Sequence, residues 1–324
     1  MDKVLIKILV ANRTDVTLRS DPHFKNQVIQ PGPSAMDCLA EHGLALSVVT
    51  IRNGERHRYL FDMGGLKKTI MNNLNAFKID YSEFEKVFLS HGHYDHWGAI
   101  LDISQQLNNG IEFILNPEGL YPRFSLGKEL TGTKIDLATL DFQQLKQEKK
   151  IRQLPDFPEK KFRELAKEKN FKLNFTNQPI TIEPGVTTSG EISVSDSEEV
   201  TKGMLIRKND TFLYDEFNDE LSLYINIQDK GLIVITGCGH RGILNTIKHG
   251  QTLTGLQEIY AVIGGFHQNW ASPERIRKTI EQFKALKPKI ICGFHCTGFK
   301  FNAECMRQLP NQTTLAVVGT TFIL

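Results

Sequence analysis

Alternating apolar and polar positions predict strands in the first part of the chain. The segments 3–11 (KVLIKILVA), 44–51 (LALSVVTI) and 57–62 (HRYLFD) are short, rich in β-branched or aromatic residues, and bounded by polar residues. Between the last two, residues 52–55 (RNGE) contain an Asn-Gly pair, which is typical of a two-residue hairpin turn. These segments therefore predict an antiparallel meander.

Later in the chain, strand and helix patterns alternate. Apolar positions at helical spacing predict helices at 65–76, 98–110, 242–250 and 272–286, with Ser272 as the cap of the last one and Pro273 at its first position. Further strands are expected at 85–90, 111–115, 180–188, 203–214, 221–227, 232–236, 258–265, 289–294 and 315–319. Two sheets between helical layers accommodate both patterns. We therefore predict an α/β (α+β) fold, a four-layer αββα sandwich that forms one domain over residues 1–324.

One segment, 117–180, has no clear strand rhythm and is punctuated by lysine and proline. This composition predicts an inserted helical region with loops. We expect this segment to be a lid over the candidate site that shapes the choice of substrate.

Composition limits the class of protein. Hydrophobic residues make up 40% of the 324 positions, charged residues 23%, and the net charge is +2, which indicates a soluble globular chain and gives no indication of nucleic-acid binding. The first residues do not resemble a signal peptide, and no apolar run approaches the ~20 residues of a membrane span. Five cysteines without a secretory signal predict reduced thiols and a cytoplasmic location. A small-molecule substrate is expected, and homo-oligomer formation stays open.

The densest chemistry is the run His91-Gly-His93-Tyr-Asp95-His96, directly after the apolar residues 87–89. In a turn that follows a strand, His91 and His93 can converge on one ion while Asp95 and His96 face a second. Imidazole and carboxylate ligands together suit zinc, iron or manganese. The run therefore predicts a metal centre rather than a polar turn.

Six residues cannot complete two metal sites, so further ligands must come from elsewhere. His240 follows the predicted strand 232–236, and His295 follows the strand 289–294. Both are flanked by glycines and come after a strand end, as His91 does, so we expect them at the same edge. His267 ends another strand and is expected to contact the substrate or a ligand.

The H-x-H-x-D-H run after a strand resembles the metallo-β-lactamase superfamily. Further motifs make the chain similar to one branch, the 7,8-dihydropterin-6-yl-methyl-4-(β-D-ribofuranosyl)aminobenzene-5'-phosphate synthases, some of which are called metal-dependent hydrolases. These motifs are Glu41-His42-Gly43, Asp62-x-Gly64, Ser189-Gly190-Glu191-Ile192, DELSLY at 219–224, TGCGHRG at 236–242, GGFH at 264–267 and HCTG at 295–298. The resemblance implies the sandwich fold, a centre with one or two metal ions, and a metal-bound hydroxide.

By position, the resemblance implies that His91 and His93 bind one metal, that Asp95 and His96 bind the other, and that His295 is the last histidine ligand. Two positions depart from the superfamily pattern. Glu191 stands where a histidine is usual, and Cys238 stands where an aspartate is usual. We expect His240 to supply the missing ligand, which leaves the number of metals and the presence of a bridging carboxylate open.

The resulting hypothesis is a metal-dependent hydrolase that acts on an ester, phosphodiester or related anionic small molecule. Zinc is the expected cofactor, as one or two ions, with iron or manganese as alternatives. Asp95, His91 and His93 are the candidate catalytic residues. Candidate substrate-binding residues are His267, Arg241, Cys238 and Glu191.

Two other functions stay open. One is a synthase that uses the same metals on a phosphoribosyl-type or pyrophosphate-bearing substrate. The other is a non-catalytic metal-binding or nucleotide-binding protein, because residues 237–242 (GCGHRG) also match the dinucleotide pattern G-x-G-x-x-G. Against dinucleotide binding, Glu258 precedes the next strand instead of ending it. We expect this loop to hold an anionic group of the substrate, helped by Arg241.

Overall fold

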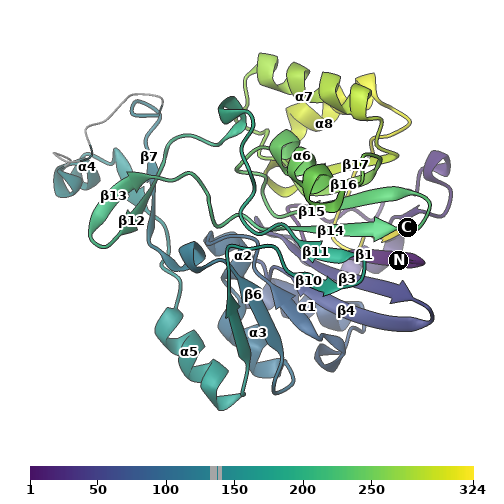
Figure 1. The fold of residues 1–324 in the computed structure, drawn as a ribbon, viewed down its shortest axis with the longest axis horizontal. Helices are drawn as coiled ribbons and strands as arrows, with labels where there is room; N and C mark the ends of the chain where they lie inside the picture. The colour runs from purple at the N-terminus through teal and green to yellow at the C-terminus, as the bar shows by residue number, and fades with distance from the viewer. Residues whose placement is uncertain (132–136, 138–140) are drawn as a thin grey trace.

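The computed structural model describes residues 1–131, 137 and 141–324. Its strands form two stacked sheets with helices on both outer sides (Figure 1). The eight-stranded sheet has the order β2-β18-β1-β3-β4-β5-β6-β9. These strands are Val28–Ile29, Thr321–Ile323, Lys3–Val10, Ala45–Arg52, Glu55–Phe61, Lys86–Phe88, Glu112–Leu115 and Lys172–Phe175. The predicted meander β1, β3 and β4 is confirmed as antiparallel, whereas β5, β6 and β9 continue the sheet in parallel.

The six-stranded sheet has the order β10-β11-β14-β15-β16-β17. Its strands are Thr181–Glu183, Val186–Thr188, Ser222–Ile227, Gly231–Thr236, Ile259–Gly265 and Ile290–Phe294. The last three strands run parallel, so their carboxyl ends meet at one edge. This edge carries His240, His267 and His295, each in the loop that follows β15, β16 or β17.

The main core lies between the sheets, where inward-facing residues such as Ile6, Val48, Leu223 and Ile233 are fully buried. Helices α1 (Lys67–Ala76), α3 (Ile100–Gln106) and α5 (Glu159–Glu168) pack on the outer face of the eight-stranded sheet. Helices α6 (Ile243–Thr254), α7 (Pro273–Leu286) and α8 (Phe299–Gln308) cover the six-stranded sheet. These layers confirm the predicted four-layer sandwich. Helix α7 also begins as predicted, because the Ser272 side chain accepts a hydrogen bond from the Arg275 N–H at 3.1 Å.

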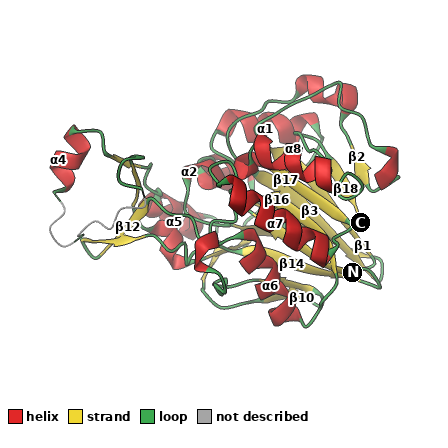
Figure 2. Ribbon diagram, turned by 90° about the horizontal axis from the view of Figure 1, so that it is seen from above, coloured by secondary structure: helices red, strands yellow, loops and turns green. Residues whose placement is uncertain are grey.

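A third, smaller sheet, β13-β12-β7-β8, projects from one side of the sandwich (Figure 2). Its strands are Thr211–Tyr214, Met204–Lys208, Arg123–Leu126 and Ile151–Gln153, and α4 (Phe142–Gln147) accompanies them. It has its own small apolar cluster around Phe124, Ile151 and Leu205. The projecting unit is therefore assembled from two stretches of chain, one before and one after α5 and β9.

Two predictions about secondary structure need correction. Segment 117–180 is not wholly helical: it contains α4 and α5 but also β7, β8 and β9, and β7 pairs with β12 on one side and with β8 on the other. Residues 132–136 and 138–140 of this segment lie outside the described part of the chain. The strand predicted at 315–319 is also wrong, because Val318 and Gly319 form a turn and the final strand, β18, follows it.

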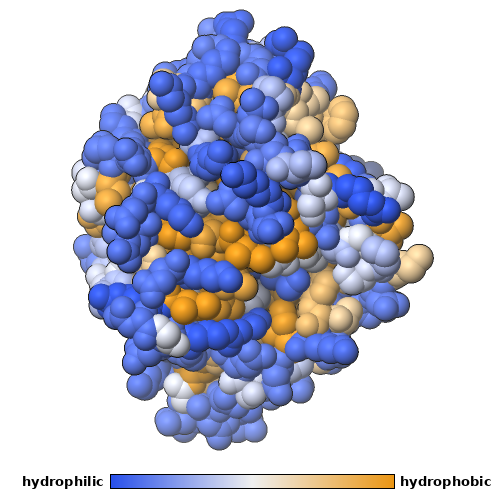
Figure 3. Space-filling view, turned by 90° about the vertical axis from the view of Figure 1, so that its right-hand side faces the viewer, coloured by the Kyte–Doolittle hydropathy of each residue, from blue (hydrophilic) through white to orange (hydrophobic). Residues whose placement is uncertain are grey.

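On the face that carries the two chain ends, apolar side chains gather in a band across the middle, with hydrophilic residues above and below (Figure 3). The band lies at the height of the stacked sheets in Figure 1, so it marks where the sandwich interior reaches the surface. Among the described residues, no helix has the length and apolar character that a membrane span requires.

Candidate metal centre

The histidine run lies in the loop after β5 and in the short helix α2 (Tyr94–Trp97). His93 is the residue before this helix, Asp95 lies in its only turn, and His96 is fully buried. Gly92 is required at the tip of the loop, because a Cβ there would lie 2.2 Å from the carbonyl oxygen of Gly119. The loop therefore presents its side chains from a backbone that is packed tightly against the chain around it.

One group of candidate ligands consists of His91, His93 and His240. One ring nitrogen of each lies within 4.8 Å of those of the other two. The Nε2 atom of each ring is buried and has no hydrogen-bond partner within the described part of the chain. Buried polar atoms normally have partners, so three unpartnered nitrogens at one point indicate a site for a cation.

A second group adjoins the first and contains Asp95, His96 and His295. The Asp95 Oδ2 atom lies 3.3 Å from His295 Nε2 and 3.8 Å from His96 Nε2. The two Nε2 atoms are 3.2 Å apart. The rings of His91 and His96 join the two groups, with centroids 4.2 Å apart. The six ligands predicted from the sequence thus come together. Four come from the loop and the helix α2 that follow β5 of the eight-stranded sheet, and two follow β15 and β17 of the six-stranded sheet.

Cys238 lies within the second group, with its Sγ atom 3.2 Å from His96 Nε2. Glu191 does not: its side chain is 42% exposed, and its nearest charged partner is Arg241 at 3.6 Å. Cys238, at the position where the superfamily usually has an aspartate, is therefore placed to bind metal. Glu191, at the position where a histidine is usual, is not. His240, by contrast, lies with His91 and His93.

Sequence reasoning did not assign a role to His42, although its motif was noted. The His42 Nε2 atom lies 3.3 Å from Asp95 Oδ2, and its ring lies 4.7 Å from that of His295, centroid to centroid. Cys296 was also missed, and its Sγ atom lies 3.3 Å from the Cys238 carbonyl oxygen. Only the adjacency of these residues to predicted ligands in other motifs could have indicated them.

Buried carboxylates hold the loops that carry the ligands. Asp62, at the end of β4, accepts hydrogen bonds from the Ser90 N–H and hydroxyl, each at 2.7 Å. Glu220 accepts from the backbone N–H groups of His240 and Arg241, at 2.6 and 2.7 Å. Burial raises the pKa of Glu220 to about 7, although these two donors act in the opposite direction. Both carboxylates orient backbone next to a ligand.

The electrostatics of the two groups differ. Burial lowers the pKa values of His91, His93 and His240 well below the ordinary value, and the facing histidines lower them further. These rings are therefore neutral near pH 7, which is the form that binds metal. Burial also lowers the pKa of His96, but the carboxylates of Asp62 and Asp95 outweigh it and raise the pKa to about 9.

Asp95 is held ionised. Burial raises its pKa, but His96 and His295 outweigh burial and lower the pKa below the ordinary value. The donor set of the whole centre, which combines imidazole nitrogens, a carboxylate and a thiol, fits a divalent transition metal.

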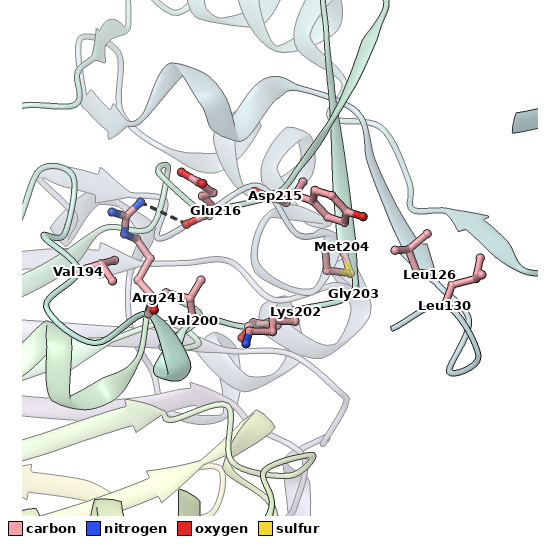
Figure 4. A pocket seen from close by; sticks show the side chains of 13 residues that line it. Leu126, Leu130, Val194, Val200, Lys202, Gly203, Met204, Asp215, Glu216 and Arg241 are labelled. Atoms are coloured by element: carbon pink, nitrogen blue, oxygen red, sulfur yellow. Dashed lines mark hydrogen bonds between the residues drawn. The ribbon is translucent and has the colours of Figure 1, made fainter. Parts of the chain in front are cut away.

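A cavity of about 550 Å³ lies beside the loop that carries His240 (Figure 4). Thr201 and Arg241 line it, and Thr201 contacts His240 directly: its N–H donates to the His240 carbonyl at 2.8 Å. Leu126, Leu130 and Met204 line the side toward the projecting sheet. The cavity is therefore shared between the sandwich and the projecting unit, next to a candidate ligand.

Arg241 is the buried cation of this cavity, with 7% of the residue exposed. Its Nη1 donates to the Glu216 carbonyl at 3.2 Å, and its Nε has no partner within the described residues. His267, the other predicted substrate contact, packs against His240 with ring centroids 4.2 Å apart and ring planes tilted by 46°. Both residues lie beside the centre, as the sequence predicted, and their roles stay predictions.

Comparison with known proteins places this geometry in context. No family model matches the chain. The 7,8-dihydropterin-6-methyl-4-(β-D-ribofuranosyl)-aminobenzene-5'-phosphate synthase of Methanocaldococcus jannaschii is 31% identical over 275 residues, which cover 83% of this chain and 85% of that protein. An uncharacterized protein of the same organism is 30% identical over 274 residues, 84% of this chain and 90% of its own.

Two solved structures share the fold. A metal-dependent hydrolase of the β-lactamase superfamily superposes with a TM-score of 0.71 at 21% identity, over 98% of both chains. The metallo-β-lactamase fold protein YhfI from Bacillus subtilis superposes with a TM-score of 0.52 at 10% identity, over 100% of both chains. At these identities the similarity concerns the fold alone.

Proposed function

Because the chain belongs to the family of the Methanocaldococcus jannaschii dihydropterin–ribofuranosylaminobenzene phosphate synthase, within the metallo-β-lactamase superfamily, we propose that this enzyme is a metal-dependent hydrolase of an anionic small molecule. The observation that carries the proposal is the convergence of three buried, unpartnered Nε2 atoms, those of His91, His93 and His240, beside the Asp95 group. Packing alone does not explain three buried ring nitrogens without partners, whereas a bound cation would give each of them a partner.

The residues divide into two ligand sets. His91, His93 and His240 would hold one ion, and Asp95, His96, His295 and Cys238 a second. Divalent metals, when bound, supply Lewis acidity and lower the pKa of a coordinated water. Asp95 Oδ2 lies beside His96 and His295, and we assign it a second task, accepting a hydrogen bond from the attacking water and orienting it. In the reaction, the water oxygen bonds to the phosphorus or carbonyl carbon, the ester bond breaks, and a proton passes to the leaving oxygen.

Arg241 would bind the charged part of the substrate. Its guanidinium is buried, borders the cavity, and has an unpartnered Nε, so an anion there would gain a charge-assisted hydrogen bond. Lys202 lines the same cavity and adds a second positive charge. The apolar side, with Leu126 and Met204, suits the uncharged part of the molecule.

A synthase is the second candidate, and the identity of 31% to a protein of that name supports it. That name describes a product in which a pterin and a ribofuranosylaminobenzene phosphate are joined. The same ligand sets would then activate a phosphate-bearing substrate toward an amine or carbon nucleophile instead of water. Incubation with a pterin pyrophosphate and an aminobenzoate separates the two reactions, because a synthase yields the coupled product and a hydrolase yields only the cleaved one.

The central test is metal analysis of the purified protein and of His91→Ala, together with turnover of a phosphodiester and lactone panel. The proposal predicts bound transition metal in the wild type and less in His91→Ala. It predicts no loss in His23→Ala, which changes an exposed histidine outside the candidate metal centre. Arg241→Ala should raise KM for anionic substrates. A wild-type protein without transition metal would contradict the proposed metal centre. An unchanged KM in Arg241→Ala would contradict the role of Arg241 in binding the anionic group.

A further inference from the structure

Two cysteines meet at the edge of the six-stranded sheet, next to the candidate metal centre. Cys238 follows β15 and Cys296 follows β17, and β16 lies between these two strands. Their loops approach each other across Gly265, the last residue of β16. A Cβ at this position would lie 2.8 Å from Cys296 Sγ and 3.1 Å from the Cys238 Cα atom. The glycine therefore leaves the space through which the side chain from one flanking strand reaches the other.

The two sulfur atoms are close enough to be joined by side-chain rotation. The Sγ atoms of Cys238 and Cys296 and a ring nitrogen of His295 all lie within 4.8 Å of one another. The Cys296 thiol donates to the Cys238 carbonyl oxygen at 3.3 Å, so it already contacts the backbone of the other cysteine. A disulfide bond is about 2.0 Å long, so the sulfur atoms have to approach by at most about 2.8 Å, which rotation about the Cα–Cβ bonds can supply.

The two thiols differ in how a reagent reaches them. Cys296 lines a second cavity, of about 620 Å³, which is separate from the cavity beside Arg241. Cys238 is not among the described residues that line either cavity. Cys292, four residues before Cys296, is fully buried between the sheets. Cys296 is therefore the thiol that a small oxidant meets first, and Cys238 lies behind it.

We propose that Cys238 and Cys296 form a modification site at which hydrogen peroxide produces a disulfide bond. The Cys296 sulfur attacks one peroxide oxygen, and the O–O bond breaks. Cys296 becomes a sulfenic acid, while the other oxygen takes the thiol proton and leaves as water. The Cys238 sulfur then attacks the sulfenic sulfur, the S–O bond breaks, and the departing hydroxyl takes the second thiol proton to give another water. Both sulfurs are oxidised, and the peroxide is reduced.

The disulfide bond removes Cys238 from the second ligand set. Cys238 Sγ lies 3.2 Å from His96 Nε2, and the thiolate is the form of cysteine that binds metal. The first ligand set contains only histidines, so oxidation should release the ion beside Cys238 and leave the other in place. This consequence rests on the proposed function, because it requires a metal ion in the second set.

The test exposes the reduced, zinc-loaded protein to hydrogen peroxide, because zinc has no redox chemistry of its own. The remaining thiols are alkylated, and the protein is digested with trypsin without reductant. Two of the five thiols should be lost, and residues 231–241 should be joined to residues 290–300. Dithiothreitol should separate the two peptides. Since Cys292 lies in the second peptide, Cys292→Ala is the matched control: it should retain the joined peptides, whereas Cys296→Ala should not form them.

Zinc release, followed with a chromophoric chelator, is measured on the same samples. The wild type should release zinc as the disulfide forms, and Cys296→Ala should bind zinc and retain it under peroxide. A wild type that keeps all five thiols, or that yields a Cys296 sulfinic acid without joined peptides, overturns the site. Joined peptides without zinc release overturn the effect on the metal. A protein that binds no zinc contradicts the proposed function alone, because the joined peptides are measured independently.

Discussion

The Oδ2 atom of Asp62 lies 2.6 Å from Nδ1 of His96, and both side chains are fully buried. Asp62 comes from the end of β4 and has a φ of +60°, a backbone conformation that few residues other than glycine, asparagine and aspartate adopt. The contact fixes the His96 ring so that Nε2 faces Asp95 and His295. A backbone that accepts strain to orient a ligand is typical of a functional site.

We therefore expect Asp62→Asn to weaken metal binding about 10- to 100-fold without unfolding the protein, since asparagine tolerates the same φ but does not carry the charge. Competition with a chelator measures the affinity. Asp229→Asn is the control, because Asp229 is exposed and has a similar φ of +57°. An equal loss of affinity in both variants would show that the effect is not specific to the Asp62–His96 contact.

A second buried contact joins the projecting sheet to the metal loop. Asp219 accepts a hydrogen bond from the Gly92 N–H at 2.7 Å, and its other oxygen lies 2.7 Å from the Arg123 guanidinium. Arg123 also donates to Asp215 at 2.8 Å. All three charged side chains are at most 2% exposed. Removing one charge leaves the others buried with incomplete compensation, so Arg123→Met should lower the free energy of unfolding by about 3–5 kcal/mol.

Urea denaturation measures this change. Arg163→Met is the matched control, because the Arg163–Glu159 pair is exposed and exposed pairs contribute less than about 1 kcal/mol. If Arg123→Met unfolds too readily for a reliable baseline, the double variant Arg123→Met/Asp215→Asn tests the same idea. Removing the Asp215 charge as well leaves only Asp219 without its partner, so part of the stability should be recovered. A stability of Arg123→Met within about 1 kcal/mol of the wild type contradicts the prediction.

Local patterns were sufficient to predict much of the sandwich. The Asn53-Gly54 hairpin has positive φ values of 51° and 82° and joins β3 to β4 as expected, because this turn depends on only two residues. The strand expected at 203–214 is found as the hairpin of β12 and β13. The other two strands of the projecting sheet, β7 and β8, were not predicted, because they are only three or four residues long and β7 pairs with β12 about 80 positions away. Short strands with distant partners have little periodic signal of their own.

In the candidate metal centre, too, the residues that local sequence patterns indicate were predictable, and those that depend on distant contacts were not. His91, His93, Asp95 and His96 were predictable because they are dense in sequence and follow a strand. His240 and His295 were predictable because parallel strands bring their carboxyl ends to one edge. Cys296 follows β17 at the same sheet edge as Cys238, so the argument from parallel strands extends to it. The contact of His42 with Asp95 depends on how one sheet stacks on the other, which no local pattern contains. Neither cavity was predictable in detail for the same reason.

An ion pair at the opposite end of the strands gives a pH dependence. His57 on β4 lies 2.8 Å from Glu85, and this hydrogen bond, followed by the charges of Glu85 and Glu183, raises the pKa of His57 above its ordinary value. Folding then favours the protonated ring. The extra stability is fully present below the unfolded pKa of about 6.5 and is lost as pH rises through the higher folded pKa.

The side chains are 34% and 46% exposed, so the contribution is expected to be below about 1 kcal/mol. His57→Gln should make the free energy of unfolding fall less between about pH 6 and about pH 8.5 than it does in the wild type. His23→Gln, at another exposed histidine, is the control. A steeper decline in His57→Gln than in the wild type would have the wrong sign for this mechanism.

The last prediction concerns which of two loops supplies the third ligand of the first group, the loop of Glu191 or the loop of His240. Glu191 lies in the turn where the superfamily usually has a histidine, but its side chain is 42% exposed and pairs with Arg241. His240 instead places an unpartnered, buried Nε2 beside His91 and His93. If His240 is the ligand, His240→Gln should reduce bound metal substantially, whereas Glu191→Gln should leave metal content unchanged.

Cobalt substitution separates the two ligand sets in the same variants, because a thiolate ligand produces a charge-transfer absorption that histidine and carboxylate ligands do not. Cys238→Ser should abolish this absorption, since Cys238 adjoins His96 in the second set. His240→Gln should lower metal content but retain the thiolate absorption of the remaining ion. Loss of metal in Glu191→Gln, with none in His240→Gln, would reverse the assignment and make the exposed turn the source of the ligand.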